Sequence, residues 1–151
     1  MADLLRKQIR DAVVTAVTGL TTTGANVFQN RVHNMPDSKL PCILVQTESD
    51  SMEFETLSEP RRERHDLTLS IEAVVKEASE TTAENSLDLI CKEVVIAMDG
   101  AAAIQALVKD FRLGSTQFSR SGEGDQPIVS AQMLWSFEYH VREGIPDMAL
   151  N

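Results

Sequence analysis

The sequence predicts an α+β fold: a mainly antiparallel sheet with two principal helices packed on one face, a long terminal β-hairpin and a projecting arm. Residues 5–20 and 87–98 place apolar residues three and four apart, the period of a helix that buries one side. Residues 67–75 and 129–141 alternate apolar and polar residues, as a half-buried strand does. Because strands and helices do not alternate one by one, we expect the helices to segregate onto one face of the sheet.

The first predicted helix has one apolar stripe and one charged side. The stripe consists of Leu5, Ile9, Val13, Ala16, Val17 and Leu20. Asp3 is placed to cap this helix, because a carboxylate oxygen can accept a hydrogen bond from a free backbone N–H of the first turn. Gly19 is expected to end it in a left-handed conformation.

The next segment predicts a loop, a strand and a turn. Residues 21–24 are a loop, and Asn26 to Val32 are the predicted first strand. A turn is expected at residues 35–38, because its proline presets φ. Leu40 precedes a second proline and is therefore extended. A short strand follows from Cys42 to Thr47.

Residues 48–65 are polar, with acidic residues first and basic residues later. We expect a mobile arm or loop here, or a short hairpin arm around residues 52–57. Long segments with few core residues are usually functional or mobile. The two blocks of charge could pair with each other within the chain, or with the opposite block of a neighbouring copy in a head-to-tail contact.

The second half of the chain predicts a strand, a helix and a terminal hairpin. Thr81 and Glu84 have the spacing of a capping box at the start of the helix. Asp99-Gly100 ends this helix, and residues 101–107 are a candidate short helix. The apolar stripe of the main helix consists of Leu87, Ile90, Cys91, Val94, Ala97 and Met98.

The terminal hairpin consists of predicted strands at residues 111–120 and 129–141, joined by a glycine-rich connection at 121–127. An extended segment as long as the second strand spans about 45 Å, against ~17–20 Å for a usual strand. It therefore either bends at a bulge or projects beyond the domain body. Residues 144–151 are a predicted flexible tail.

The whole chain of 151 residues is predicted to form a single domain, residues 1–151. Its net charge of −9 argues against sequence-independent binding to nucleic acid, which depends on Lys and Arg. It has neither the apolar run of a membrane span nor that of a secretory signal, so we expect a protein made in a cytoplasm. Cys42 and Cys91 lie in apolar stretches and are expected to be plain buried thiols.

No motif predicts catalysis, a cofactor or a metal, and we expect the protein not to be an enzyme. Gly19 and Gly24 have the spacing of a phosphate-binding loop, but Ala25 and Asn26 stand where that loop needs Lys and Ser or Thr. Three histidines occur in separate elements, at His33, His65 and His140. Since a metal needs converging ligands, each is expected to be a surface or interface histidine instead.

Several phrases of the chain resemble the tail terminator family of tailed phages and prophages, which includes the minor tail protein U of lambda-like phages. The resemblance runs over nearly the whole chain. Its phrases are "TTTGANVFQNRVHNMPDSKLPCILVQT", "RHDLTLSIEAVVKE", "LDLICKEVVIAMDG" and "QPIVSAQMLWSFEYHVREG". They share with the family an N-terminal helix, a glycine-led strand and a strand that starts at Leu-Pro.

The resemblance implies a structural role in the virion, at the head-proximal end of the tail, after assembly in the host bacterial cytoplasm. Proteins of this family form a ring, typically a hexamer, on the last ring of the tail tube. The implied partners are further copies, the tail tube protein and a head-completion or connector protein, with no cofactor and no membrane. DNA would only pass through the lumen, and an acidic chain would repel its phosphates.

Two other functions remain open from the sequence: a neck or head–tail connector protein of the same particle, and a small-molecule-binding α+β domain. The second needs an apolar pocket with convergent polar groups. For a subunit interface we expect the arm to be used, because its charges can set the register between copies. The expected interface residues are Glu53, Phe54, Glu55, Arg61, Arg62 and Arg64.

Overall fold

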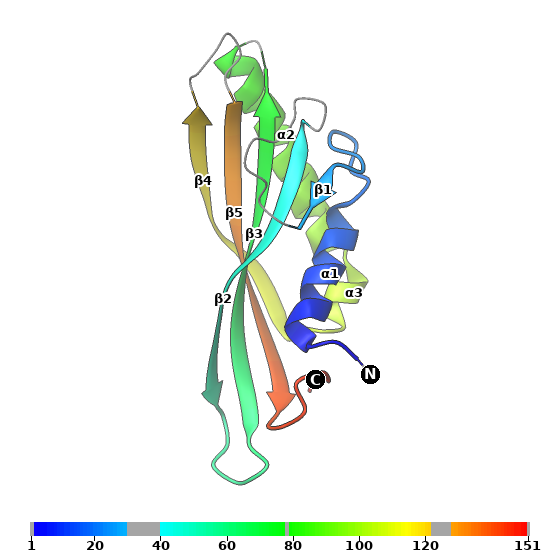
Figure 1. Ribbon diagram of the computed structural model, residues 1–151, viewed down its shortest axis with the longest axis vertical. Coiled ribbons are helices and arrows are strands. Elements are labelled where there is room, and N and C mark those ends of the chain that lie inside the picture. Colours follow the sequence, from blue (N-terminus) through cyan, green and yellow to red (C-terminus); the bar gives the residue numbers. More distant parts are fainter. Residues whose placement is uncertain (1, 30–39, 78, 122–127, 151) are drawn as a thin grey trace.

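The computed structural model describes residues 2–29, 40–77, 79–121 and 128–150. In this part of the chain the strands are β1 (Val27–Phe28), β2 (Cys42–Phe54), β3 (Arg62–Lys76), β4 (Asp110–Ser121) and β5 (Ile128–Arg142). The helices are α1 (Leu5–Val17), α2 (Glu80–Asp99) and α3 (Ala102–Gln105). The strands form one sheet in the order β1-β2-β3-β5-β4 (Figure 1). Only β1 and β2 are parallel, so the predicted α+β class with a mostly antiparallel sheet and two main helices is confirmed.

The core lies between the sheet and the helices. The odd-numbered residues of β3 from Leu67 to Val75 and of β5 from Val129 to Val141 are buried, in agreement with the predicted alternation. α1 packs on β2, and α2 packs on β3 and β5. We call the side of the sheet that carries the helices the helix-side face and the opposite side the outer face. No helix in the described residues is long and apolar enough to span a membrane.

The start of α1 differs from the prediction, and its end agrees. The N-cap is Leu4, which makes no side-chain capping bond. The carboxylate of Asp3 instead pairs with the ammonium of Lys7, at 2.9 Å. The helix stops at Val17, and Gly19 takes a φ of +88°, the left-handed conformation that the sequence predicted.

The cap of α2 was also assigned to the wrong residue. Ser79 is the N-cap, and its hydroxyl accepts a hydrogen bond of 3.2 Å from the backbone N–H of Thr82. The predicted capping residue, Thr81, lies inside the first turn, because the helix begins one residue earlier at Glu80. The predicted end at Asp99-Gly100 and the short helix within residues 101–107 are confirmed.

The segment at residues 48–65 is mostly strand. β2 continues to Phe54, where it pairs antiparallel with Glu63 of β3. Of the predicted forms, the structure therefore has a hairpin, with its connection at residues 55–61. We call residues 49–68 the distal arm, and Figure 1 shows that it extends past the helical layer. Its mobility remains a prediction.

Four other predicted features fall partly or wholly outside the described residues. The strand expected at residues 26–32 is described only as the short β1, and the turn at residues 35–38 lies outside, as does His33. Most of the predicted connection at residues 121–127 also lies outside.

The last strand is as long as the sequence predicted, and it does project. β5 pairs with β3 along its whole length, from Ile128 to Arg142. Its pairing with β4 starts only at Glu138, opposite Asp110, so the last residues of β5 extend beyond β4 alongside the distal arm. The register irregularities lie in its neighbours, between Thr47 and Ser49 in β2 and between Leu113 and Ser115 in β4.

The segment predicted as a flexible tail makes hydrogen bonds to the body. The backbone N–H of Leu5 donates to the carbonyl of Pro146 at 2.9 Å, and that of Leu150 donates to the carbonyl of His140 at 2.8 Å. Residues 144–150 therefore contact both α1 and the projecting end of β5. Their flexibility remains a prediction.

Candidate functional site: the distal arm

The six residues predicted as an interface come together in the distal arm. Glu53 and Phe54 end β2, Glu55 and Arg61 lie in the connection, and Arg62 and Arg64 begin β3. Strand pairing puts Glu53 directly opposite Arg64, and Arg64 opposite His140 of β5. The site is therefore a three-stranded surface, and its third strand was not part of the prediction.

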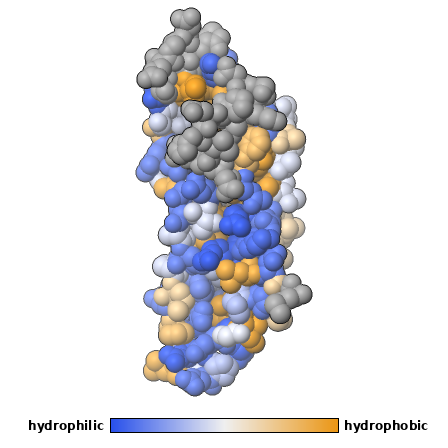
Figure 2. Space-filling view, in the orientation of Figure 1, coloured by the Kyte–Doolittle hydropathy of each residue, from blue (hydrophilic) through white to orange (hydrophobic). Residues whose placement is uncertain are grey.

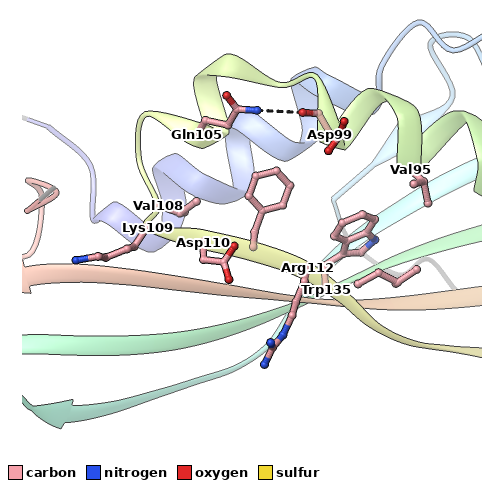
Figure 3. Close-up of a pocket in the computed structure, with 10 residues that line it drawn as sticks. Val95, Asp99, Gln105, Val108, Lys109, Asp110, Arg112 and Trp135 are labelled. Atoms are coloured by element: carbon pink, nitrogen blue, oxygen red, sulfur yellow. Dashed lines mark hydrogen bonds between the residues drawn. The ribbon is translucent and has the colours of Figure 1, made fainter.

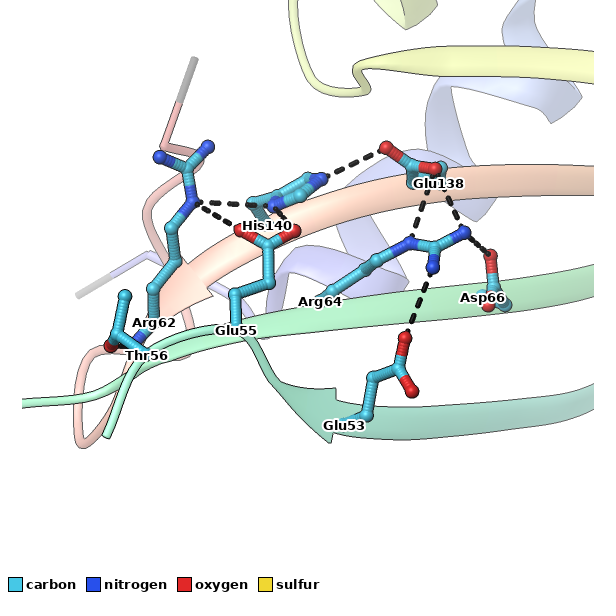
Figure 4. Close-up of polar contacts among 8 residues, drawn as sticks. All are labelled: Glu53, Glu55, Thr56, Arg62, Arg64, Asp66, Glu138 and His140. Carbon is cyan, nitrogen blue, oxygen red and sulfur yellow. Dashed lines mark hydrogen bonds and ion pairs between the residues drawn. The ribbon is translucent and has the colours of Figure 1, made fainter.

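Arg64 lies at the centre of an ion-pair cluster on the outer face (Figure 4). Its guanidinium donates to Glu53 at 3.0 Å and to Glu138 at 3.2 Å, and it lies 3.6 Å from the carboxylate of Asp66. One cation is thus shared among three carboxylates. Its side chain is 36% exposed, so solvent screens these pairs and their contribution to stability is small.

His140 lies next to this cluster and is only 3% exposed, so of the two predicted roles it is not a surface histidine, and an interface role stays a prediction. Its Nε2 is 2.9 Å from Glu138, and its Nδ1 is 3.1 Å from Glu55. Arg62 covers the ring from the other side, with Nε 3.3 Å from Nδ1 and 3.2 Å from Glu55. The imidazole ring of His140 is buried because the long side chains of Arg62, Glu55 and Glu138 surround it (Figure 4).

The outer-face cluster as a whole is acidic. It contains two arginines, Arg62 and Arg64, and four carboxylates, namely Glu53, Glu55, Asp66 and Glu138. With neutral histidine, negative charge exceeds positive charge by two. Figure 2 shows that mainly hydrophilic residues cover the middle of the molecule in that view, with small hydrophobic areas between them. An excess of one sign on a surface favours a partner of the opposite sign.

Substituting Glu138 by glutamine is expected to flatten the acid dependence of stability. The hydrogen bond with His140, aided by Arg64, holds the pKa of Glu138 below its usual value, although burial opposes this. A carboxyl group whose folded pKa is lowered contributes stability that is present above its unfolded pKa of ~4.3 and is lost as the pH falls through the folded pKa. Urea unfolding between pH 7 and pH 3 measures this.

In that experiment the wild type should lose more stability on acidification than Glu138→Gln. The control is Glu59→Gln, which removes one carboxylate at a side chain that is 76% exposed and pairs with Arg61. Parallel curves for the wild type and Glu138→Gln would show that the cluster contributes nothing to the acid dependence.

A second polar cluster lies on the helix-side face, at the base of the distal arm. The carboxylate of Asp50, 6% exposed, accepts from the Tyr139 hydroxyl at 2.6 Å and from Arg6 at 3.1 Å. His65 lies 3.0 Å away and stacks on the Tyr139 ring, with centroids 4.6 Å apart. Burial, followed by the bond to Asp50, raises the pKa of Tyr139. Asp50 thereby connects α1, β2, β3 and β5.

Sequence reasoning missed Asp50, Tyr139 and Glu138 as members of these clusters. Asp50 was one of several acidic residues in a polar segment, and its partner Tyr139 is 89 positions away. Only the strand register brings them together. The sequence held one weak signal: an acidic residue that pairs with a half-buried strand can become buried, and a buried carboxylate needs partners.

The end of the distal arm combines an arginine with exposed apolar side chains. Arg61 lies over the Phe54 ring, 4.4 Å from its centroid, and its Nε is 3.1 Å from the carboxylate of Glu143. Phe54 is nevertheless 43% exposed, Met52 46% and Leu57 97%. In the described residues, the acidic and basic blocks of the arm therefore pair within the chain, one of the two alternatives above. Pairing with a neighbouring copy remains a prediction.

A pocket of about 480 Å³ lies between the end of α2, α3 and the start of β4 (Figure 3). Val95 and Trp135 contribute apolar surface, and Gln105 donates a hydrogen bond to the backbone carbonyl of Asp99. Figure 3 shows the charged ends of Lys109 and Arg112 pointing away from the pocket. Asp99 and Asp110 also line the pocket, and the amide of Gln105 is already engaged by the backbone. The small-molecule-binding alternative stays a prediction.

The two cysteines have the environment of structural thiols. Cys42 is fully buried, and burial raises its pKa to about 11. Burial also raises the pKa of Cys91, which is partly exposed. Because the thiolate is the reactive form, both are poor nucleophiles near neutral pH. Among the described residues, no group of three or more His, Cys, Asp or Glu is arranged to hold a metal ion.

Comparison with known proteins gives a likeness to solved structures. No protein-family model matches the sequence. No curated protein matches it either. Among solved structures, the chain is similar to one described as the virion of a native gene transfer agent (GTA) particle. That match has 18% sequence identity and a TM-score of 0.37, and it covers 89% of this chain and 92% of the other.

Proposed function

We propose that this protein is a structural component of a phage-like virion, one that forms a ring on the end of the tail tube. In this role it terminates tail growth and provides the surface to which the head joins. The observation that carries the proposal is the distal arm: a long, charged extension of the sheet that projects past the helices and keeps apolar side chains exposed at its end. Such surfaces mark protein–protein contacts.

Two further observations support a structural role rather than a chemical one. The polar clusters of the arm consist of ion pairs that satisfy one another, and in the pocket near α3 the amide of Gln105 is engaged by the backbone carbonyl of Asp99. The family resemblance of the sequence supports the tail-terminator role in particular. It also supports a hexameric ring, the tail tube protein and a head-completion or connector protein as partners, and a lumen through which DNA passes.

The test is to purify the protein and measure its mass by light scattering over a range of concentrations, and then to image tails by electron microscopy. We expect concentration-dependent self-association and labelled protein at the head-proximal end of the tail. A strict monomer at high concentration that is absent from tail ends would contradict the proposal. Protein found on the head side of the joint only would favour the connector role instead.

Reversing Arg61 and Arg62 to glutamate is expected to block ring formation or tail joining while leaving the fold intact. Both side chains are about one-third exposed, and their partners are Glu55, Glu59 and Glu143. Partly exposed ion pairs contribute only ~0–1 kcal/mol each, so the body should remain folded. Circular dichroism checks the fold, and electron microscopy counts joined tails of normal length.

The control for this double variant is Lys7→Glu, which reverses a charge on α1 at a side chain that is 47% exposed. It should fold and assemble as the wild type does. Normal-length, joined tails from the Arg61/Arg62 variant would show that the end of the arm is not an interface.

A further inference from the structure

The edge strand β4 is left uncovered by the helices. It is the last strand of the sheet, whereas the two main helices pack on β2, β3 and β5. Its helix-side face carries Leu113, 38% exposed, and Phe118, 62% exposed. On the facing flank of α2, Val95 and Ile96 are 40% and 63% exposed. Together these four side chains line an apolar groove of about 450 Å³ along the edge of the sheet.

Within the part of the chain that the structure describes, the opposite edge of the same sheet is also unpaired over most of its length. β1 pairs with β2 only at Ile43 and Leu44, and no other described strand borders β2 on that side. The two edges are similar in length, since β2 has 13 residues and β4 has 12. An unpaired strand edge presents free N–H and C=O groups and readily pairs with another strand.

On the helix-side face both edges carry exposed apolar side chains. Met52 and Phe54 lie on this face of β2, because they are paired through β3 with Tyr139 and Val141 of the core. Both are nearly half exposed. If β2 lay beside β4 of another copy, these two side chains would continue the apolar surface of Leu113 and Phe118.

On the outer face the two edges carry opposite charge. On this face, strand register places Ser49, Ser51 and the acidic Glu53 in the distal part of β2, and β2 contains no lysine or arginine. Glu53, whose side chain is 67% exposed, belongs to the outer-face cluster, in which the carboxylates outnumber the arginines. β4 presents Arg112 on the same face, opposite Ser136 of β5, and Figure 3 shows its guanidinium directed away from the pocket near α3.

We propose that the β4 edge of one copy receives the β2 edge of a second copy, so that the sheet continues from subunit to subunit. The match on both faces, apolar on the helix side and charged on the outer side, favours a second copy over an unrelated partner. The contact joins two different surfaces of the chain, and repetition of such a contact closes a ring when the rotation allows it. The inference rests on the proposed function and identifies the surfaces that build the ring.

A charge swap tests the outer-face contact in the full-length chain. Arg112→Glu and Glu53→Arg, each alone, should weaken self-association about tenfold, because each places like charges against each other across every contact. The double variant restores opposite charges and should recover the wild-type association. Analytical ultracentrifugation over a range of concentrations measures all four proteins, and Lys7→Glu on α1 is the control for a charge reversal away from both sheet edges and from the distal arm.

A second pair of variants tests the apolar face. Phe118→Asp should also weaken self-association about tenfold or more, since it puts a charge into the apolar contact, whereas Leu89→Asp should not. Leu89 is the matched control because it is 49% exposed on α2 and does not line the groove. Both positions are exposed, so both variants should fold, which circular dichroism verifies.

The possible failures of the two proposals are distinct. If both single charge variants and Phe118→Asp associate and cap tails as the wild type does, the edge contact is overturned while the tail-end role stands. If these variants lose tail joining but self-associate as the wild type does, β4 contacts a different partner, and the edge contact between copies is also overturned. If the wild type self-associates through β4 but never occupies tail ends, the tail-terminator role fails and the edge contact stands.

Discussion

Replacing Asp50 by alanine is expected to lower the free energy of unfolding by about 3 kcal/mol, which is the usual cost of breaking a buried charged cluster from one side. The substitution leaves the Tyr139 hydroxyl without its 2.6 Å acceptor and removes the partner of Arg6. The carboxylate is 6% exposed, so water cannot readily replace it. Urea unfolding at pH 7 measures the change.

The matched control is Tyr139→Phe, which removes one hydroxyl and leaves Asp50 with its partners Arg6 and His65. It should cost only about 1 kcal/mol, the net value of one hydrogen bond. Equal and small effects for the two variants would mean that Asp50 does not hold the base of the distal arm together.

Replacing Phe137 by alanine is expected to lower the free energy of unfolding by about 3–5 kcal/mol, the usual cost of removing a buried aromatic ring. Phe137 is fully buried, and its ring stacks on Phe111 of β4 with centroids 5.7 Å apart. The cavity left by alanine would lie at the centre of the sheet, where neighbouring strands on both sides restrict collapse. Thermal and urea unfolding measure the loss.

Two controls accompany that variant. Phe137→Leu keeps most of the volume and should cost clearly less than Phe137→Ala. Phe118→Ala removes the same ring from a position that is 62% exposed, and it should change stability by less than ~1 kcal/mol. A cost below ~1 kcal/mol for Phe137→Ala would contradict the assignment of this residue to the core.

Asp50 and Phe137 lie in one row across the sheet. Strand register places Asp50 opposite Leu67, Leu67 opposite Phe137, and Phe137 opposite Phe111. The row marks the point where the apolar core below the helices gives way to the polar distal arm. Loosening it should change how the arm is held as well as the stability of the body, so both variants are also expected to reduce assembly.

The strands and helices were predictable where one face of an element packs on a core. The period-two pattern at residues 67–75 and 129–141 and the helical stripes correspond to β3, β5, α1 and α2. The helix caps were predicted less well: Asp3 and Thr81 are both chemically able to cap, but neither is the N-cap of its helix. Which residue becomes the N-cap depends on where the chain turns, and Asp3 pairs with Lys7 instead.

The position of the distal arm along the chain was predictable, but the residues that come together in it were not. The segregation of acidic from basic residues marked residues 48–65, and six residues of this segment stood out by their charge or apolar character. Its length as paired strand was not apparent, because polar residues outside a core leave no hydrophobic period to detect. The partners Glu138 and His140 come from β5, which along the sequence looks like a plain amphipathic strand.

By itself, the sequence determined the α+β class, the elements that bury an apolar face and the absence of a strong basic character. These follow from local periodicity and composition, which act within a few residues of each position. Only the tertiary structure decided which charges pair, that the Asp50 side chain and His140 are buried, and that, among the described residues, β4 and most of β2 are left as unpaired edges. These depend on strand order and register, which bring together residues such as Asp50 and Tyr139, 89 positions apart, and which no local pattern encodes.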